Sequence, residues 1–245
     1  MDVREDEELE LESHGSWLHF LFRLPFLPSW LPEIVLHSAL IILILGLGSY
    51  LFTRRLQKIP SKSQSFLEIV VIGLDNFVKG IIPQGSRYTP LIGSFFIYIL
   101  VMNLFGLIPG MLSPTSNLNT TIALALVTLF SVQYFAIKKH GVLGWLKHFA
   151  GEPLGMAPLM FPVHVISELA KPFSLCIRLF ANIFGEDMSI MMIIIFLPIL
   201  LKYVIPAPTY IFMVFMAVFT SIVQALIFSV LSAVYIGFAL GEEGD

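Results

Sequence analysis

Five charged side chains lie inside one very apolar stretch of the sequence, residues 161–200: Glu168, Lys171, Arg178, Glu186 and Asp187. A charge in the middle of a membrane-spanning helix costs about 2.5–3.5 kcal/mol on insertion scales, so each of these residues requires an explanation. Arg178 cannot lose its proton under physiological conditions, because the pKa of a guanidinium group is above about 12. The stretch therefore predicts a permanent cation inside a bilayer, with titratable acids on either side of it.

The polar residues of this stretch share one side of the predicted helix. Consider a helical wheel that turns about 100° per residue, with Arg178 at zero. Lys171 and Ser189 then lie at about 20°, His164 and Asn182 at about 40°, and Glu168 and Glu186 at about 80°. Asp187 lies at about 180°, on the opposite side of the helix. The polar arc must face water or partner groups, because lipid cannot satisfy it. Acids on both sides of a fixed cation predict two separate aqueous routes with an electrostatic barrier between them.

A purely structural interpretation of the same charges is also open. Glu168 and Lys171 are three residues apart on the helix and could neutralise each other. The Lys171 side chain could also extend to the cytoplasmic interface. Arg178 is flanked by apolar residues for several turns and has no such route, so a role in ion transport is favoured for it.

The rest of the chain provides apolar elements that would hold this helix in a membrane. Hydrophobic residues make up 57% of the 245 residues and charged residues only 13%, which is about half the charged fraction of a soluble domain. A membrane-spanning helix needs about 20 apolar residues. We predict an all-α membrane protein with five transmembrane helices, at about residues 34–53, 90–109, 118–137, 161–200 and 206–240.

Two features of this plan depart from a simple helical bundle. Residues 61–82 carry their polar side chains at helical steps, which predicts one amphipathic helix in the cytoplasmic interface. The stretch of 40 residues from 161 to 200 would make about 60 Å of helix, whereas the hydrocarbon core is about 30 Å thick. We therefore expect the last two helices to form a long, steeply tilted hairpin, with Pro172 and Gly185 as the positions where bending costs least.

The basic residues predict the orientation of the chain. Residues 1–33 form an acidic tail and an outer-side interfacial segment, residues 34–240 a single membrane domain, and residues 241–245 a cytoplasmic tail. With the N-terminus outside and the C-terminus in the cytoplasm, nine of the fourteen Lys and Arg residues fall in cytoplasmic loops, as the positive-inside rule requires. We expect the histidines other than His164, at positions 14, 19, 37, 140 and 148, at the surface or the interface.

Three segments resemble subunit a of the F-type ATP synthase, the stator subunit beside the rotating c-ring. Residues 167–188, SELAKPFSLCIRLFANIFGEDM, contain R-L-F-A-N-I-F-G-E-D, which is similar to the signature of that family. Residues 223–240, VQALIFSVLSAVYIGFAL, resemble its closing helix, and residues 102–109, MNLFGLIP, resemble its Asn-containing segment. The resemblance covers most of residues 34–240.

The resemblance implies roles for individual residues. Arg178 matches the essential arginine that faces the c-ring carboxylate, and Asn182 and Gln224 match its polar neighbours. Asp187 matches the acid of the outer half-channel, Asn103 a polar residue near it, and Lys171 a basic residue two helical turns before the arginine. Many members have an acid at the position of His164, so either Glu168 or a neutral His164 would serve the inner half-channel, while Glu186 would support Asp187.

The implied function is that of a stator subunit that translocates protons, or alternatively sodium ions, through two offset half-channels. The chain would not be an enzyme by itself, and we expect no cofactor, no metal and no nucleic acid. Its expected partners are the c-ring, the peripheral stalk subunit b and membrane lipid, in a bacterial inner membrane. A secondary ion-coupled transporter is the alternative. The chain shows no inverted repeat, and its intramembrane charges lie on one helix only, both of which disfavour a transporter.

Overall fold

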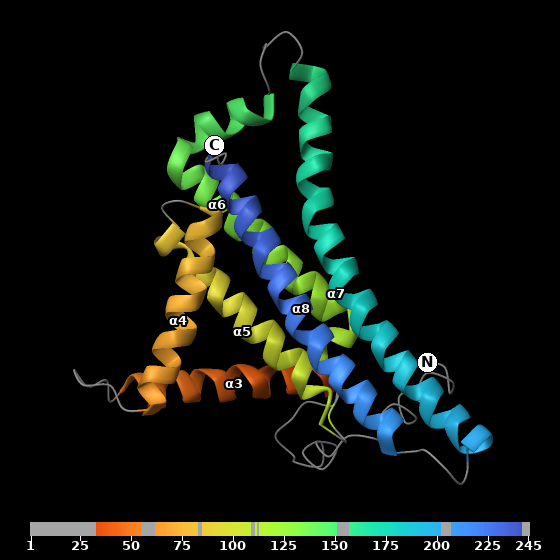
Figure 1. Ribbon diagram of the computed structural model, residues 1–245. Coiled ribbons are helices and arrows are strands. Elements are labelled where there is room, and N and C mark those ends of the chain that lie inside the picture. The colour runs from red at the N-terminus through yellow and green to blue at the C-terminus, as the bar shows by residue number, and fades with distance from the viewer. Residues whose placement is uncertain are drawn as a thin grey trace, which may run out of the picture. The chain divides into compact units, whose positions relative to one another are not determined.

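The computed structural model describes residues 33–54, 62–82, 85–108, 111, 113–150, 157–201 and 207–241. These residues form six α-helices and two 3-10 turns, and no strand occurs among them (Figure 1). The helices are α3 (Glu33–Thr53), α4 (Lys62–Ile81), α5 (Thr89–Phe105), α6 (Leu118–Ala150), α7 (Ala157–Leu201) and α8 (Ala207–Leu240), and the turns are η1 (Gly85–Arg87) and η2 (Pro114–Ser116). The predicted all-α class is confirmed. The acidic tail, most of the loop after residue 201 and the last four residues lie outside the described part.

Side chains on the helix surfaces confirm a membrane protein. The stretches Ile34–Thr53, Leu118–Leu146 and Phe212–Leu240 are three described helices long and apolar enough to cross a bilayer, and α5 is apolar but shorter. Large apolar side chains are exposed along these helices, among them Leu43, Phe130 and Phe215. Soluble proteins rarely expose contiguous apolar surface of this kind, so lipid or partner subunits must cover it. The number of five crossings and the tilt of the last two helices stay predictions.

Two helix ends differ from the predicted spans. Helix α5 ends at Phe105, four residues before the expected residue 109, and the chain then turns through bonds from Leu107 N to Leu104 O and from Ile108 N to Phe105 O. Helix α6 continues to Ala150 instead of ending near residue 137, but Gly141 inside it has φ 72° and ψ 168°. Those angles are almost exclusive to glycine, so α6 is two helical segments that meet at Gly141.

The described residues cluster into two compact units, and the prediction of a single membrane domain stays a prediction. The first unit comprises Met1–Leu56, Tyr98–Asn117 and Ile183–Ile222. In it the loop after α5 returns onto its own helix, because a Cβ at Gly106 would lie only 2.5 Å from Cβ of Ser113. His37 of α3 is fully buried, with its ring edge-on to Phe105 at 6.2 Å. The expectation of a surface or interfacial His37 is therefore wrong, because α3 turns this residue toward the end of α5.

The second unit comprises Gln57–Ile97, Leu118–Asn182 and Val223–Asp245. Its core is an apolar cluster drawn from four helices: Val78, Ile82, Ile92, Val132, Ala233, Ile236 and Leu240. The ring of Phe95 on α5 meets Phe228 on α8 edge-on at 5.8 Å. Helix α8 buries Ala225, Ser229 and Ala233 at steps of four residues, and such small side chains let neighbouring helices approach closely in a membrane.

Helix α4 has the polar stripe predicted for an interfacial helix. Gln64 donates to Glu68 at 2.8 Å, and Lys79 pairs with Asp75 at 2.5 Å, each pair one turn apart. The Thr89 hydroxyl donates to Asp75 Oδ1 at 2.8 Å and thereby joins α4 to the start of α5. Hydrogen bonds from Lys79 and then Thr89 hold the pKa of the Asp75 carboxyl below its ordinary value of 3.8. The location of α4 in the cytoplasmic interface stays a prediction.

Helices α7 and α8 run antiparallel in the second unit. Asn182 of α7 bonds to Gln224 of α8. Lys171, eleven residues before Asn182 on α7, lies over the ring of Tyr235, which is eleven residues after Gln224 on α8. The two contacts therefore follow the two helices in opposite directions. The predicted hairpin pairing is therefore confirmed. Helix α7 continues through both Pro172 and Gly185 as one α-helix.

Candidate functional site

Arg178 projects away from the core of its own chain. It is exposed, whereas Leu175, Cys176 and Leu179 around it on α7 are buried. These buried neighbours fix the rotation of α7, because their apolar side chains pack inside the second unit. A guanidinium that is exposed here, on a helix surrounded by apolar residues, is available to a group outside this chain.

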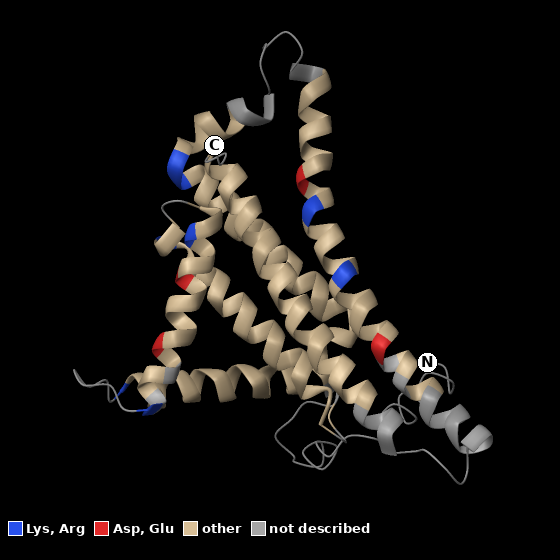
Figure 2. Cartoon of the chain, in the orientation of Figure 1, with Lys and Arg blue, Asp and Glu red and all other residues tan. Residues whose placement is uncertain are grey.

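The surface on which Arg178 lies is lined by small side chains. Ser167, Ala170, Ser174 and Ala181 are all exposed on α7 and fall within about 80° of Arg178 on the helical wheel. Small residues on a membrane helix allow the backbone of a partner helix to approach closely. Figure 2 shows that acidic and basic residues are spaced along α7, while α5 and α8 have none in their sequences.

An amide pair lies one turn beyond Arg178. Nδ2 of Asn182 donates to Oε1 of Gln224 at 2.7 Å. Gln224 is buried on α8, while Asn182 remains exposed on the same side of α7 as Arg178. The structure therefore brings these two predicted neighbours of Arg178 into direct contact. Such interhelical bonds in membranes contribute about 0.6 kcal/mol on average.

Glu168 and Lys171 form an ion pair about two turns before Arg178, which is one of the two arrangements that their sequence positions left open. Both side chains are partly buried, with 21% of Glu168 and 27% of Lys171 exposed. The second carboxylate oxygen of Glu168 accepts a hydrogen bond from Nε2 of Gln133 on α6 at 3.0 Å. His164 is half-buried one turn before Glu168.

The residues assigned to the outer half-channel belong to the first unit. Asn103 is buried, and its Oδ1 accepts a hydrogen bond from Oγ1 of Thr115 at 2.8 Å. Its Nδ2 has no hydrogen-bond partner within the described part of the chain, and neither does the buried hydroxyl of Ser221. Glu186 is half-buried, and the side chain of Asp187 lies outside the described residues. Buried amide donors usually have a partner, so the Asn103 amide is suited to bind a polar group.

Comparison with known proteins decides the family. A family model described as "ATP synthase A chain" matches residues 34–237. "ATP synthase subunit a" of Protochlamydia amoebophila is 37% identical over 95% of this chain and 86% of that protein. "ATP synthase subunit a 3" of Pelobacter propionicus is 41% identical over 86% of this chain and 88% of that protein, and the Geobacter sulfurreducens protein is 38% identical over the same shares.

The chain belongs to the ATP synthase subunit a family. Membership supports a role in ion translocation within the membrane sector of an ATP synthase, as a component of that complex. It also favours the stator interpretation over the transporter alternative. Assignment to subunit a confirms the resemblance seen in the three sequence segments, including the one that contains Arg178.

Three residues near the charged face of α7 were not predicted from the sequence: Gln133 and Tyr235 contact that face, and Trp145 contacts Gln133. Gln133 bonds to Glu168, the indole N–H of Trp145 donates to Gln133 Oε1 at 2.7 Å, and Tyr235 lies against Lys171. Gln133 did carry a signal, because an amide inside the apolar stretch 118–137 needs a partner. Trp145 lies outside the predicted span 118–137, and its bond to Gln133 depends on the change of direction at Gly141, which the sequence did not reveal.

Proposed function

We propose that this chain is the stator subunit through which protons, or alternatively sodium ions, pass to and from a rotating c-ring. The observation that carries the proposal is the exposed position of Arg178 among small residues on α7. A partner helix can approach this surface closely enough to place a carboxylate beside the guanidinium. The c-ring supplies that partner, and subunit b and lipid cover other parts of the chain.

Arg178 controls which charge state of the ring carboxylate faces the stator. An ionised carboxylate is attracted to the guanidinium, and it cannot leave for lipid because burying a charge costs far more than burying a neutral acid. Once an ion neutralises the carboxylate, the site can turn through lipid. The fixed positive charge also repels a free cation, so ions cannot leak directly between the two half-channels. The transmembrane potential contributes about 2.3 kcal/mol per charge per 100 mV.

The outer half-channel is lined by Asp187, Glu186 and Asn103. The buried Asn103 amide without a hydrogen-bond partner among the described residues supports this assignment. The amide pair of Asn182 and Gln224 lies one helical turn beyond Arg178, as a polar neighbour of the guanidinium.

The inner half-channel uses His164. Both carboxylate oxygens of Glu168 are engaged, one by Lys171 and one by Gln133, so Glu168 is assigned to the ion pair and not to the channel. A neutral imidazole accepts a hydrogen bond at one ring nitrogen and donates from the other, so His164 can relay protons. The N-terminus is outside and the C-terminus cytoplasmic in a bacterial inner membrane, and the chain itself forms no covalent bond with a substrate.

Substitution of Arg178 tests the proposal. Arg178→Ala should abolish coupled ATP synthesis in inverted membrane vesicles while the complex still assembles. Lys138→Ala is the matched control, because it removes an exposed positive charge from α6 instead of α7. Normal coupled synthesis in the Arg178 variant, at the same amount of assembled complex, would refute the assigned role.

A further inference from the structure

We propose that Gln133 and Trp145 of α6 are positioning residues for Arg178. They hold the Glu168–Lys171 pair in place. This fixes the direction of α7 at Pro172, where the helix lacks one backbone hydrogen bond. The proposal rests on the proposed role of Arg178, and it adds two residues from a different helix to the machinery of ion translocation.

The contacts form one continuous series across three helices. The indole N–H of Trp145 donates to Oε1 of Gln133 at 2.7 Å, and Nε2 of Gln133 donates to Oε2 of Glu168 at 3.0 Å. Oε1 of Glu168 accepts from the ammonium group of Lys171, which lies 5.8 Å from the centre of the Tyr235 ring on α8. We call these five residues the α6–α8 bridge. Gln133 accepts from Trp145 and donates to Glu168, so its removal breaks both hydrogen bonds that join α6 to this pair.

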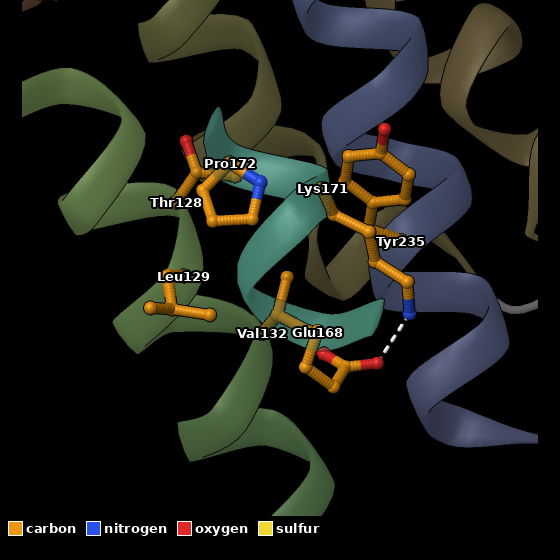
Figure 3. A pocket seen from close by; sticks show the side chains of 7 residues that line it. All are labelled: Thr128, Leu129, Val132, Glu168, Lys171, Pro172 and Tyr235. Carbon is orange, nitrogen blue, oxygen red and sulfur yellow. Dashed lines mark hydrogen bonds and ion pairs between the residues drawn. The ribbon is translucent and has the colours of Figure 1, made fainter. Parts of the chain in front are cut away.

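The bridge lies at the point where α7 has lost a backbone hydrogen bond. Pro172 has no N–H, so the carbonyl of Glu168 receives no bond from the position four residues later. Figure 3 shows Glu168, Lys171 and Pro172 around one small pocket, with Thr128, Leu129 and Val132 of α6 and Tyr235 of α8 completing its wall. The pocket has a volume of about 10 Å³, which is room for a single water molecule. Side-chain contacts of Glu168 and Lys171 therefore lie next to the position of the missing backbone bond.

The direction of α7 after Pro172 decides where Arg178 points. Arg178 is six residues later, about 9 Å along the helix axis. Between these two residues, Cys176 Sγ lies 3.4 Å from Oγ1 of Thr121 on α6. If the bridge is broken, α7 can bend at Pro172. The distance between Thr121 and Cys176 and the direction of the Arg178 side chain then vary more.

The contact between Thr121 and Cys176 provides a reporter that does not depend on ion transport. Cys176 is the only cysteine of the chain, so a Thr121→Cys variant of the complete complex can form one disulfide within it. We would measure the rate of this disulfide on addition of copper phenanthroline, together with ATP-driven proton pumping per ATP hydrolysed. Gln133→Leu and Trp145→Phe break the bridge. Ser131→Ala, which removes a hydroxyl that bonds only to Val127 O in the described structure, is the matched control.

The expected result is a disulfide that forms about fivefold more slowly in both bridge variants than in the control, which is the effect of losing one ordinary hydrogen bond. Proton pumping per ATP should also fall, at an unchanged amount of assembled chain. Trp145→Phe keeps an aromatic ring, so it remains informative if Gln133→Leu fails to assemble. An unchanged or faster rate in the assembled variants would overturn the proposal.

A Gln133→Glu variant separates hydrogen bonding from packing, because it keeps the size of the side chain. The introduced carboxyl would face Glu168 of α7, with Lys171 and Tyr235 next to it and Trp145 on its other side. Relative to the control at each pH, the disulfide should form slowly at high pH and recover as the pH falls, since a protonated carboxyl can donate to Glu168 as Gln133 does. A rate that equals the control at every pH would mean that Gln133 acts only by packing and would overturn the proposal.

The same variants distinguish failure of this proposal from failure of the proposed function. If Arg178→Ala abolishes coupling and the bridge variants leave the disulfide rate unchanged, Arg178 acts without the bridge. If Arg178→Ala remains coupled and the bridge variants slow the disulfide, the bridge orders α7 but the assigned role of Arg178 is wrong, so the proposal as stated falls with it.

Discussion

Removal of the Lys171 ammonium group tests how the charged face of α7 is stabilised. Lys171→Met keeps the length of the side chain but leaves the Glu168 carboxylate without its counter-ion. Breaking a fully buried pair costs about 3–5 kcal/mol. Since 21% of Glu168 and 27% of Lys171 remain exposed, water compensates part of this loss, and we expect about 2 kcal/mol.

The matching double variant, Lys171→Met with Glu168→Gln, should recover most of that stability. It removes both charges, leaves no uncompensated carboxylate and keeps an amide oxygen for the Gln133 donor, so it should lie within about 1 kcal/mol of the native protein. The assay is thermal unfolding of the purified membrane sector, where 2 kcal/mol corresponds to about 4–8 °C in Tm for a chain of this size. A double variant as unstable as Lys171→Met alone would refute the reasoning, because the two residues would then not be coupled.

Three further outcomes follow from individual residues. Asp187→Asn should reduce proton flux through the membrane sector more than Glu186→Gln, and the reverse ranking would mean that the assignment of the outer acid is wrong. Gly141→Ala should lower the free energy of unfolding by about 1–3 kcal/mol, because alanine is strained at its backbone angles, whereas Gly73→Ala in open space on α4 should not destabilise. Because Lys79 and Thr89 hold the pKa of Asp75 below 3.8 in the folded state, their stabilisation is present above that pH and is lost as the pH falls through the folded-state pKa. Acid unfolding should therefore begin at a higher pH in Lys79→Met than in the native protein. If the pH at which unfolding begins is unchanged, this contribution is absent.

The sequence predicted those features that depend on local pattern. Apolar length located the helices, and the three-residue spacing of Glu168 and Lys171 indicated that they could pair, because helical periodicity alone brings them together. Hydropathy reports where lipid contact ends and not where a helix ends. For that reason the predicted span ended at residue 137, although α6 continues to a change of direction at Gly141.

Features that depend on packing between distant segments were not predictable in the same way. Gln133 and Glu168 are 35 residues apart. The residues around each of them do not indicate that the two side chains will be hydrogen-bonded. His37 was expected at the surface or the interface, together with the other histidines outside the charged stretch. Its burial against Phe105 depends on how the loop after α5 folds back, which requires the close approach at Gly106.

The most direct test of the account is a density map of the purified complex with its c-ring. The account predicts that the guanidinium of Arg178 lies within about 4 Å of a carboxylate of the ring, or one water molecule away from it. An Arg178 side chain directed into lipid, or one paired only within its own chain with no ring carboxylate opposite, would contradict it.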